Sequence, residues 1–217
     1  MKNYVITVAR GFGSGGKDIA TMLSKDLGIP VYDRQILQMA SEMSGIAEGL
    51  FYDVDEKLRG GYLTNLLKKV PFSTVAEPSQ KDFTSDVNLF NLQADIIRNL
   101  AATESCIIIG KCADYLLRGC GNVVSVYVEA PRADCVKSIM GKLKVGEDEA
   151  NQMIHRTDKY RAEYYKYYTG GGYWTNPINY DMTLNSARIG RKKCVELVKD
   201  YLKIKFETNE EERGGPS

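Results

Sequence analysis

The sequence predicts an α/β domain built on a parallel sheet. Short apolar runs of strand length alternate with segments of helical periodicity along most of the chain, a pattern typical of strands joined by crossover helices. A glycine-rich turn joins the first predicted strand to the first predicted helix, where such domains often bind an anion. At 217 residues, the chain has the length of one domain, with or without an inserted sub-domain.

The first two strands and helices are predicted from apolar pattern and helix-end signals. Tyr4 to Ala9 is a strand-like run, and a helix is expected at about 17–27, ending before Gly28, which suits a helix C-terminus. A very short strand at Val31-Tyr32 follows, and Asp33 can cap the next helix. The predicted apolar stripe of that helix consists of Ile36, Leu37, Ala40 and Met43.

The remaining elements continue the alternation of helix and strand. In chain order we expect a helix at about 87–103, a buried strand at 106–109, a strand at 123–128, a helix after Pro131, a charged helix at about 147–168, a strand at about 181–185 and a closing helix capped by Ser186. Residues 45–86 contain glycine and proline breaks and are predicted to be a mobile insertion. Residues 207–217 are predicted to be a disordered tail, so that the domain covers residues 1–206.

Composition argues against several classes of function. Lys and Arg total 29 and Asp and Glu total 28, so no global field attracts nucleic acid or an anionic membrane. The chain has no apolar run of about 18 residues and no signal-peptide core near Met1, which predicts a soluble cytoplasmic protein without a membrane partner. Five cysteines without a Cys-x-x-Cys pair, and the single His155, argue against a disulfide framework, a zinc site and a Ser-His-Asp hydrolase.

The segment Gly11 to Asp18 fits two nucleotide-binding fingerprints. Its glycines give G-x-G-x-x-G, and its first glycine with Gly16-Lys17 gives G-x-x-x-x-G-K. The dinucleotide interpretation is supported by Asp33, which lies 20 residues beyond Gly13 and follows a strand, as a ribose-binding acid does. The triphosphate interpretation is supported by the lysine and by the basic residues of the helix at 147–168, because phosphoryl transfer needs cationic contacts. Both interpretations remain open on pattern alone.

Four segments, taken together and in order, resemble a known family. They are Ile6 to Lys17, Ile29 to Arg34, Ile108 to Leu117 and Tyr180 to Asn185. They resemble the cytidylate kinase-like family, P-loop proteins related to nucleoside monophosphate kinases. The resemblance implies a three-layer α/β P-loop kinase fold with a parallel central sheet, a helical monophosphate-binding insertion after the second strand, and a lid at about 147–172 that ends in three glycines.

The resemblance makes the glycine-rich loop an ATP site. Its phosphate-binding residues would be Gly11, Gly13, Ser14, Gly15, Gly16, Lys17 and Asp18. Lys17 would act between the β- and γ-phosphates as a catalytic residue. A standard P-loop has Ser or Thr after the lysine as a Mg²⁺ ligand, and this chain has Asp18 there, so Asp18 or Ser14 is the expected metal ligand.

The resemblance also assigns acceptor and lid residues. Asp33 and Arg34 match the position where such kinases begin to hold the acceptor nucleotide, and Lys111 stands where relatives often have an arginine that contacts the acceptor phosphate. Arg156 and Arg161 match catalytic lid arginines that close on the transferring phosphoryl group. The resemblance therefore implies a small nucleotide acceptor that is held by the insertion together with Asp33 and Arg34.

Aromatic residues on the charged helix are predicted to pack against the domain. Tyr160, Tyr164, Tyr167 and Tyr168 recur at helical spacing, and Trp174 follows the three glycines. Packing is favoured over base stacking for each of them.

The predicted function is that of an ATP- and Mg²⁺-dependent kinase that transfers the γ-phosphoryl group to a small acceptor, with a nucleoside monophosphate such as CMP favoured. A nucleotide-binding regulatory protein with little turnover is the alternative. It is suggested by Asp18 and by the strand at 106–109, which ends at Gly110 without the acid that often helps to hold the metal. A nicotinamide-dependent oxidoreductase is the third hypothesis.

Overall fold

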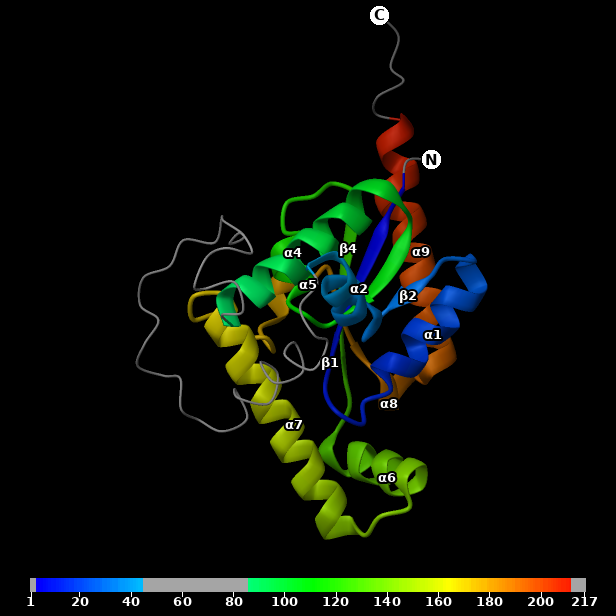
Figure 1. The fold of residues 1–217 in the computed structure, drawn as a ribbon. Coiled ribbons are helices and arrows are strands. Elements are labelled where there is room, and N and C mark those ends of the chain that lie inside the picture. Colours follow the sequence, from blue (N-terminus) through cyan, green and yellow to red (C-terminus); the bar gives the residue numbers. More distant parts are fainter. Residues whose placement is uncertain (1–2, 45–85, 212–217) are drawn as a thin grey trace, which may run out of the picture.

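The fold has three layers, with a parallel sheet between two layers of helices (Figure 1). The computed structural model describes residues 3–44 and 86–211. In this part of the chain, five strands form one sheet in the order β2-β3-β1-β4-β5, and every neighbouring pair is parallel. The strands are β1 (Val5–Arg10), β2 (Val31–Tyr32), β3 (Cys106–Ile109), β4 (Val123–Glu129) and β5 (Met182–Asn185).

Helices cover both faces of the sheet, and one helical pair extends away from it. Helices α1 and α9 lie on one face, α2, α4 and α5 lie on the other, and α6 and α7 project beyond the sheet (Figure 1). The bounds are α1 (Gly16–Leu27), α2 (Gln35–Ser44), α4 (Asp86–Thr103), α5 (Ala113–Leu116), α6 (Arg132–Leu143), α7 (Glu147–Tyr168), α8 (Ser186–Ile189) and α9 (Arg191–Glu211), with a 3₁₀ turn at Pro177–Asn179. Among the described residues, no helix is both long and apolar enough to cross a membrane.

The order of the strands decides between the two fingerprints of the glycine-rich loop. In a dinucleotide-binding fold the second strand lies beside the first. Here β3 lies between them, with Val5 of β1 opposite Cys106 and Val31 of β2 opposite Ile107. The dinucleotide interpretation, and with it the oxidoreductase hypothesis, therefore loses its structural basis.

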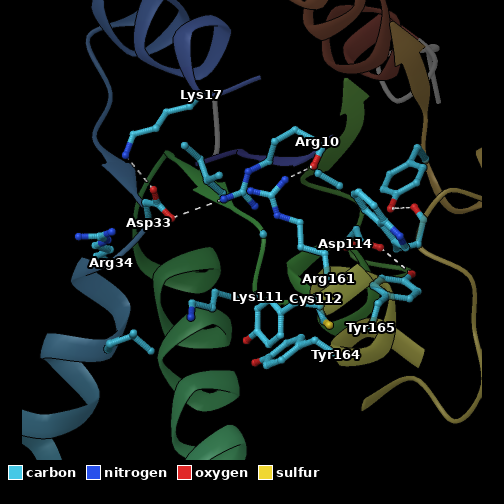
Figure 2. A pocket seen from close by; sticks show the side chains of 17 residues that line it. Arg10, Lys17, Asp33, Arg34, Lys111, Cys112, Asp114, Arg161, Tyr164 and Tyr165 are labelled. Carbon is cyan, nitrogen blue, oxygen red and sulfur yellow. Dashed lines mark hydrogen bonds and ion pairs between the residues drawn. The ribbon is translucent and has the colours of Figure 1, made fainter. Parts of the chain in front are cut away.

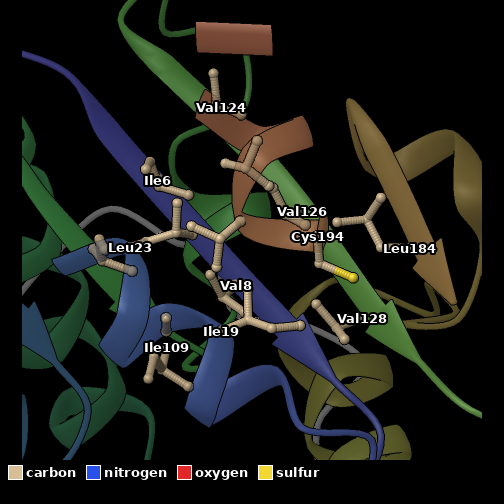
Figure 3. Packing of buried hydrophobic residues seen from close by; sticks show 14 of the residues in the cluster. Ile6, Val8, Ile19, Leu23, Ile109, Val124, Val126, Val128, Leu184 and Cys194 are labelled. Carbon is tan, nitrogen blue, oxygen red and sulfur yellow. The ribbon is translucent and has the colours of Figure 1, made fainter. Parts of the chain in front are cut away.

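The sheet is buried on both faces because successive side chains of a strand point to opposite sides. Ile6 and Val8 of β1 pack with Ile19 and Leu23 of α1 on one face, as Figure 3 shows. Val5, from the same strand, packs against α2 and α4 on the other face. Near-continuous apolar strands such as Cys106–Ile109 follow from this double burial, which the sequence pattern predicted.

The predicted elements form, with differences at several helix ends and stripes. Met43 was expected in the apolar stripe of α2 but is 70% exposed in the last turn of that helix. Asn185, rather than Ser186, caps the helix after β5, and Gly190, with φ of 81°, divides the expected closing helix into α8 and α9. Helix α9 continues through Glu211, beyond the predicted domain boundary at residue 206. The predicted insertion up to residue 85 and residues 212–217 of the tail lie outside the described residues.

Candidate active site

A cavity of about 340 Å³ lies at the carboxyl ends of β1, β2 and β3. Helix α7 and the segment before β5 close its other side (Figure 2). The carboxyl ends of parallel strands are where α/β proteins bind ligands, because loops leave the sheet there and helix N-termini converge. The sheet topology therefore explains why residues far apart in the sequence meet in this cavity.

The cavity carries an excess of positive charge. Among the residues that the structure describes, its lining includes the five cations Arg10, Lys17, Arg34, Lys111 and Arg161 and the two carboxylates Asp33 and Asp114. An anionic ligand would balance this excess. The lining thus brings together five of the sequence-predicted site residues, Lys17, Asp33, Arg34, Lys111 and Arg161, and adds Arg10, to which the sequence assigned no role.

Tyrosines of α7 and Trp174 form an aromatic wall in the cavity lining. Tyr164 and Tyr165 of α7 are buried in a cluster with Trp174, and Phe90 of α4 stacks on Tyr168 with ring centroids 3.7 Å apart. Packing, which the sequence predicted, is confirmed for the buried rings of Tyr164, Tyr168 and Trp174, and Tyr160 and Tyr167 pack half-buried against the same cluster. The cavity lining is thus partly cationic and partly aromatic.

Asp114 is a carboxylate at the aromatic side of the cavity. Its Oδ2 accepts a hydrogen bond of 2.8 Å from the hydroxyl of Tyr165. Burial raises the pKa of Asp114 above its ordinary value, and the bond from Tyr165 opposes this shift. The pair joins α5 to α7 and fixes the aromatic wall.

Lys17 and Arg10 pair with different oxygens of the Asp33 carboxylate. Lys17 Nζ is 3.1 Å from Asp33 Oδ2, and Arg10 Nη2 is 3.8 Å from Asp33 Oδ1. The Lys17 side chain is 67% exposed, so its amine can leave Asp33 for a phosphate at little cost. Asp33 therefore acts as the counter-ion of two cations rather than as the helix cap that the sequence suggested.

Arg10 is held where β1 meets the glycine-rich loop. A side chain at Gly16 would overlap Cβ of Arg10, and one at Gly110 would overlap its Nη1, so both glycines leave room for this arginine. Burial and the neighbouring Arg161 lower the pKa of Arg10 to about 9, which leaves it protonated at neutral pH. The sequence did contain a signal for the role of Arg10, because it is a charged residue at the end of a mostly apolar strand.

The glycine-rich loop is fixed by contacts from three directions. The Ser14 hydroxyl lies 2.9 Å from the carbonyl oxygen of Gly11 and 3.0 Å from that of Val128, and the hydroxyl of Ser186 donates to the carbonyl oxygen of Ser14. The N–H of Phe12 donates to Asp158 Oδ1 of α7 at 2.8 Å. Beyond this loop, the first N–H groups of α1 have no partner within the helix and can bind phosphate oxygens.

The two residues predicted to bind Mg²⁺ are engaged elsewhere. Asp18 is 2.6 Å from Lys142 Nζ of α6 and 2.5 Å from Arg191 Nη1 of α9. Ser14 is buried, with its hydroxyl directed at the backbone. Neither offers a free oxygen to a metal in this arrangement, so these two residues do not fit the predicted metal site.

The predicted lid arginines are separated by the structure. Arg161 lines the cavity, and its Nη1 donates to the carbonyl oxygen of Arg10 at 2.8 Å and to Asp158 Oδ1 at 3.2 Å. Arg156 is exposed and lines a separate surface depression with His155 and Lys159. The five-residue spacing on α7 turns the two arginines to different sides of the helix.

The other two predicted acceptor residues, Arg34 and Lys111, also line the cavity. Arg34 is exposed at the start of α2. Lys111 follows β3 in a run of three residues, Gly110, Lys111 and Cys112, that all have positive φ. Left-handed non-glycine residues are uncommon, and they concentrate at functional sites.

Solved structures share this architecture. An uncharacterized protein from Eubacterium ventriosum superimposes with a TM-score of 0.66 and 22% identity, over 93% of this chain and 99% of that one. Shikimate kinase from Bacteroides thetaiotaomicron gives 0.50 and 12%, over 92% and 98%. A protein from Thermus thermophilus, TT1252, gives 0.51 and 15%, over 95% and 99%. These likenesses concern the fold.

Strand order and structural neighbours together define a P-loop kinase fold. The family model of the cytidylate kinase-like family matches residues 5–188. The chain belongs to that family, as the sequence motifs predicted. A search of curated proteins finds no match. A kinase-like family on a P-loop kinase fold supports a phosphotransferase that binds a nucleotide.

Proposed function

We propose that this protein is an ATP-dependent phosphotransferase that moves the γ-phosphoryl group to a small acceptor, with a nucleoside monophosphate such as CMP favoured. One observation carries the proposal: a cationic cavity with an aromatic wall lies directly beside the glycine-rich loop and shares Lys17 with it. We place the enzyme in the cytoplasm, where ATP and nucleoside monophosphates are available.

The donor would bind along the glycine-rich loop. The N–H groups that begin α1 and the amine of Lys17 would hold its phosphates. A groove of about 430 Å³ on the far side of the loop, between Gly13, α6 and the start of α9, has the size for the donor's nucleoside. The acceptor would then occupy the cavity at the carboxyl ends of β1 to β3.

Catalysis would consist of positioning and charge stabilisation. An oxygen of the acceptor phosphate attacks the γ-phosphorus, the bond from that phosphorus to the bridging oxygen breaks, and the electron pair leaves on ADP. The attacking oxygen is already ionised, so no proton has to be removed. Lys17 and Arg161 would stabilise charge on the transferred group, and the aromatic wall would exclude water so that transfer exceeds hydrolysis.

Mg²⁺ normally accompanies ATP and neutralises charge on the phosphates in this reaction class. The contacts of Ser14 and Asp18 do not support them as its ligands. No step above depends on a metal ligand from the protein. The engagement of Asp18 favours one alternative, a nucleotide-binding regulatory protein with this fold and little turnover.

Incubation with Mg·ATP and a set of nucleosides, nucleoside monophosphates and phosphorylated metabolites separates the two functions. The proposal predicts ADP and a new phosphate ester that both depend on one class of acceptor. ATP binding without acceptor-dependent ADP would instead support the regulatory protein. The Lys17→Ala variant, assayed in parallel, controls for contaminating kinases because it should lose the activity.

A further inference from the structure

The guanidinium of Arg10 is enclosed, and no residue that the structure describes accepts a hydrogen bond from it. Its side chain is 18% exposed, and its head group carries five N–H donors. Among the described residues, none accepts a hydrogen bond from it, and its ion-pair partner Asp33 is 3.8 Å away. An enclosed charge without such bonds is costly, so folds usually provide them.

Arg161 shows that the cavity can supply hydrogen-bond acceptors to an arginine. Its side chain is 20% exposed, close to the value for Arg10, yet its Nη1 donates to Asp158 and to the backbone carbonyl of Arg10. The fold therefore bonds the backbone carbonyl of Arg10 and leaves room for its side chain beside Gly16 and Gly110. The N–H donors of its guanidinium have no acceptor among the described residues. Open donors facing a cavity indicate a site for an oxyanion.

We propose that Arg10 binds an oxyanion carried by the acceptor, so that the acceptor already has a phosphate or carboxylate group before transfer. This inference rests on the proposed function. The position of the guanidinium favours the acceptor, rather than the γ-phosphate of ATP, as the source of this oxyanion. Lys17 lies on one oxygen of Asp33 and Arg10 on the other, and Nη1 of Arg10 lies against Gly110, in the loop after β3.

The chemistry of the site narrows the class of acceptor. A guanidinium fork matches two oxygens of a phosphate or carboxylate at once. The cationic excess of the cavity lining suits an acceptor with one or two negative charges, and the aromatic wall suits a flat ring at its other end. A nucleoside monophosphate has this combination, whereas a neutral nucleoside lacks the group that Arg10 would bind.

Binding measured without turnover tests the inference. Isothermal titration in the absence of ATP would compare CMP with cytidine, the other nucleoside monophosphates with their nucleosides, and a sugar phosphate with its sugar. The wild type should bind the anionic member of at least one pair at least tenfold more tightly. Arg10→Gln should weaken that binding about 10- to 100-fold, Arg10→Lys should weaken it less, and neither should change the affinity for ATP by more than about twofold.

Arg98→Gln provides the matched control, because Arg98 is an exposed arginine of α4 that pairs with Asp95 away from the cavity. It should bind like the wild type. Arg10→Gln removes an enclosed charge that lacks hydrogen bonds, so its Tm should equal or exceed that of the wild type. If this variant does not fold, Arg10→Lys and the comparison of anionic with neutral ligands on the wild type decide the question.

Three results would overturn the inference: equal wild-type binding of anionic and neutral members in every pair, unchanged binding in the Arg10 variants, or an equal loss of ATP affinity in them. The last would assign Arg10 to the donor. Failure of the proposed function looks different, because an anionic compound would bind through Arg10 and yet no acceptor would produce ADP.

Discussion

Two charged clusters on the same sheet are stabilised in opposite ways. Asp181, just before β5, accepts bonds from the N–H and hydroxyl of Ser125, from Lys205 Nζ and from the hydroxyl of Tyr201, at 2.7 to 3.2 Å. Burial alone would raise the pKa of Asp181, but these donors lower it below its ordinary value. In the cluster of Arg10, Arg161 and Asp158 at the edge of the cavity, burial lowers the pKa of Arg10 and raises that of Asp158.

This difference in how the charges are stabilised indicates that the Asp181 cluster is structural and that the cavity cluster is functional. At Asp181 the fold supplies donors that favour the charged form, so this charge stabilises the protein. At the cavity the charged forms are disfavoured and the donors of Arg10 stay open, so the missing interactions have to come from a ligand. Variants in the cavity should therefore affect activity more than stability, and variants at Asp181 should do the reverse.

The largest effect is expected for Lys17→Ala. The amine meets charge that shifts during transfer, so kcat should fall about 10²- to 10³-fold with a smaller change in ATP affinity. Steady-state kinetics and ATP titration would measure both, with Lys25→Ala, an exposed lysine in the last turn of α1, as control. An unchanged kcat would remove Lys17 from the mechanism.

Arg161→Lys should slow turnover about tenfold or more, because lysine keeps the charge but lacks the planar guanidinium that can bind two oxygens of the transferred group at once. Arg156→Lys, on the outer side of the same helix, should have a smaller effect on kcat. Measuring kcat for both variants compares the two predicted lid residues directly. Equal losses would mean that Arg156 reaches the transferring group after α7 moves.

Asp181→Asn should lower the free energy of unfolding at pH 7 by about 1–3 kcal/mol while leaving kcat close to that of the wild type. The folded-state pKa is depressed, so this stabilisation is complete above the unfolded value of 3.8 and is lost as the pH falls through the folded value. Urea unfolding at pH 7 and pH 3 should show the difference at pH 7 and little at pH 3. Asp200→Asn, on an exposed pair with Lys203, is the control, and an equal loss there would contradict the comparison.

Asp158→Asn should have the smallest effect, because an amide oxygen can still accept the bond from the N–H of Phe12. The folded-state pKa of Asp158 is raised, so its contribution to stability is complete below pH 3.8 and is lost as the pH rises through the folded value. Unfolding free energies at a series of pH values should therefore decline less over that window in the variant. Identical pH profiles would show that Asp158 does not titrate in this way.

The hinge predicted at the glycines after α7 has a different setting in the structure. Gly170 and Gly171 have positive φ and close the helix, with the N–H of Gly171 donating to the carbonyl oxygen of Lys166. The adjacent turn of α7 is the part anchored in the aromatic cluster, through Tyr165 and Tyr168. Movement of the lid about this end would separate the stacked rings of Phe90 and Tyr168, and the hinge stays a prediction.

Most elements could be predicted because their signals are local. The alternation of apolar runs and periodic segments fixed β1, β3 and α7, and the φ of 66° at Gly28 follows from its place after α1. Motif residues such as Lys17 and Asp33 were recognised for the same reason: a few neighbouring residues identify them. Their meeting in one cavity follows from the parallel sheet that those elements build.

Only the tertiary structure decided which of the charged residues face that cavity. Arg10 depends on Gly110 in another loop and on Arg161, which is 151 positions away in the sequence. Asp18 is turned from the predicted metal site by Lys142 and Arg191, which come from two other helices. Sequence spacing determines the direction of a side chain on its own element, but burial and charge partners are set by packing between elements, and these decide whether a charge is neutralised by the fold or left for a ligand.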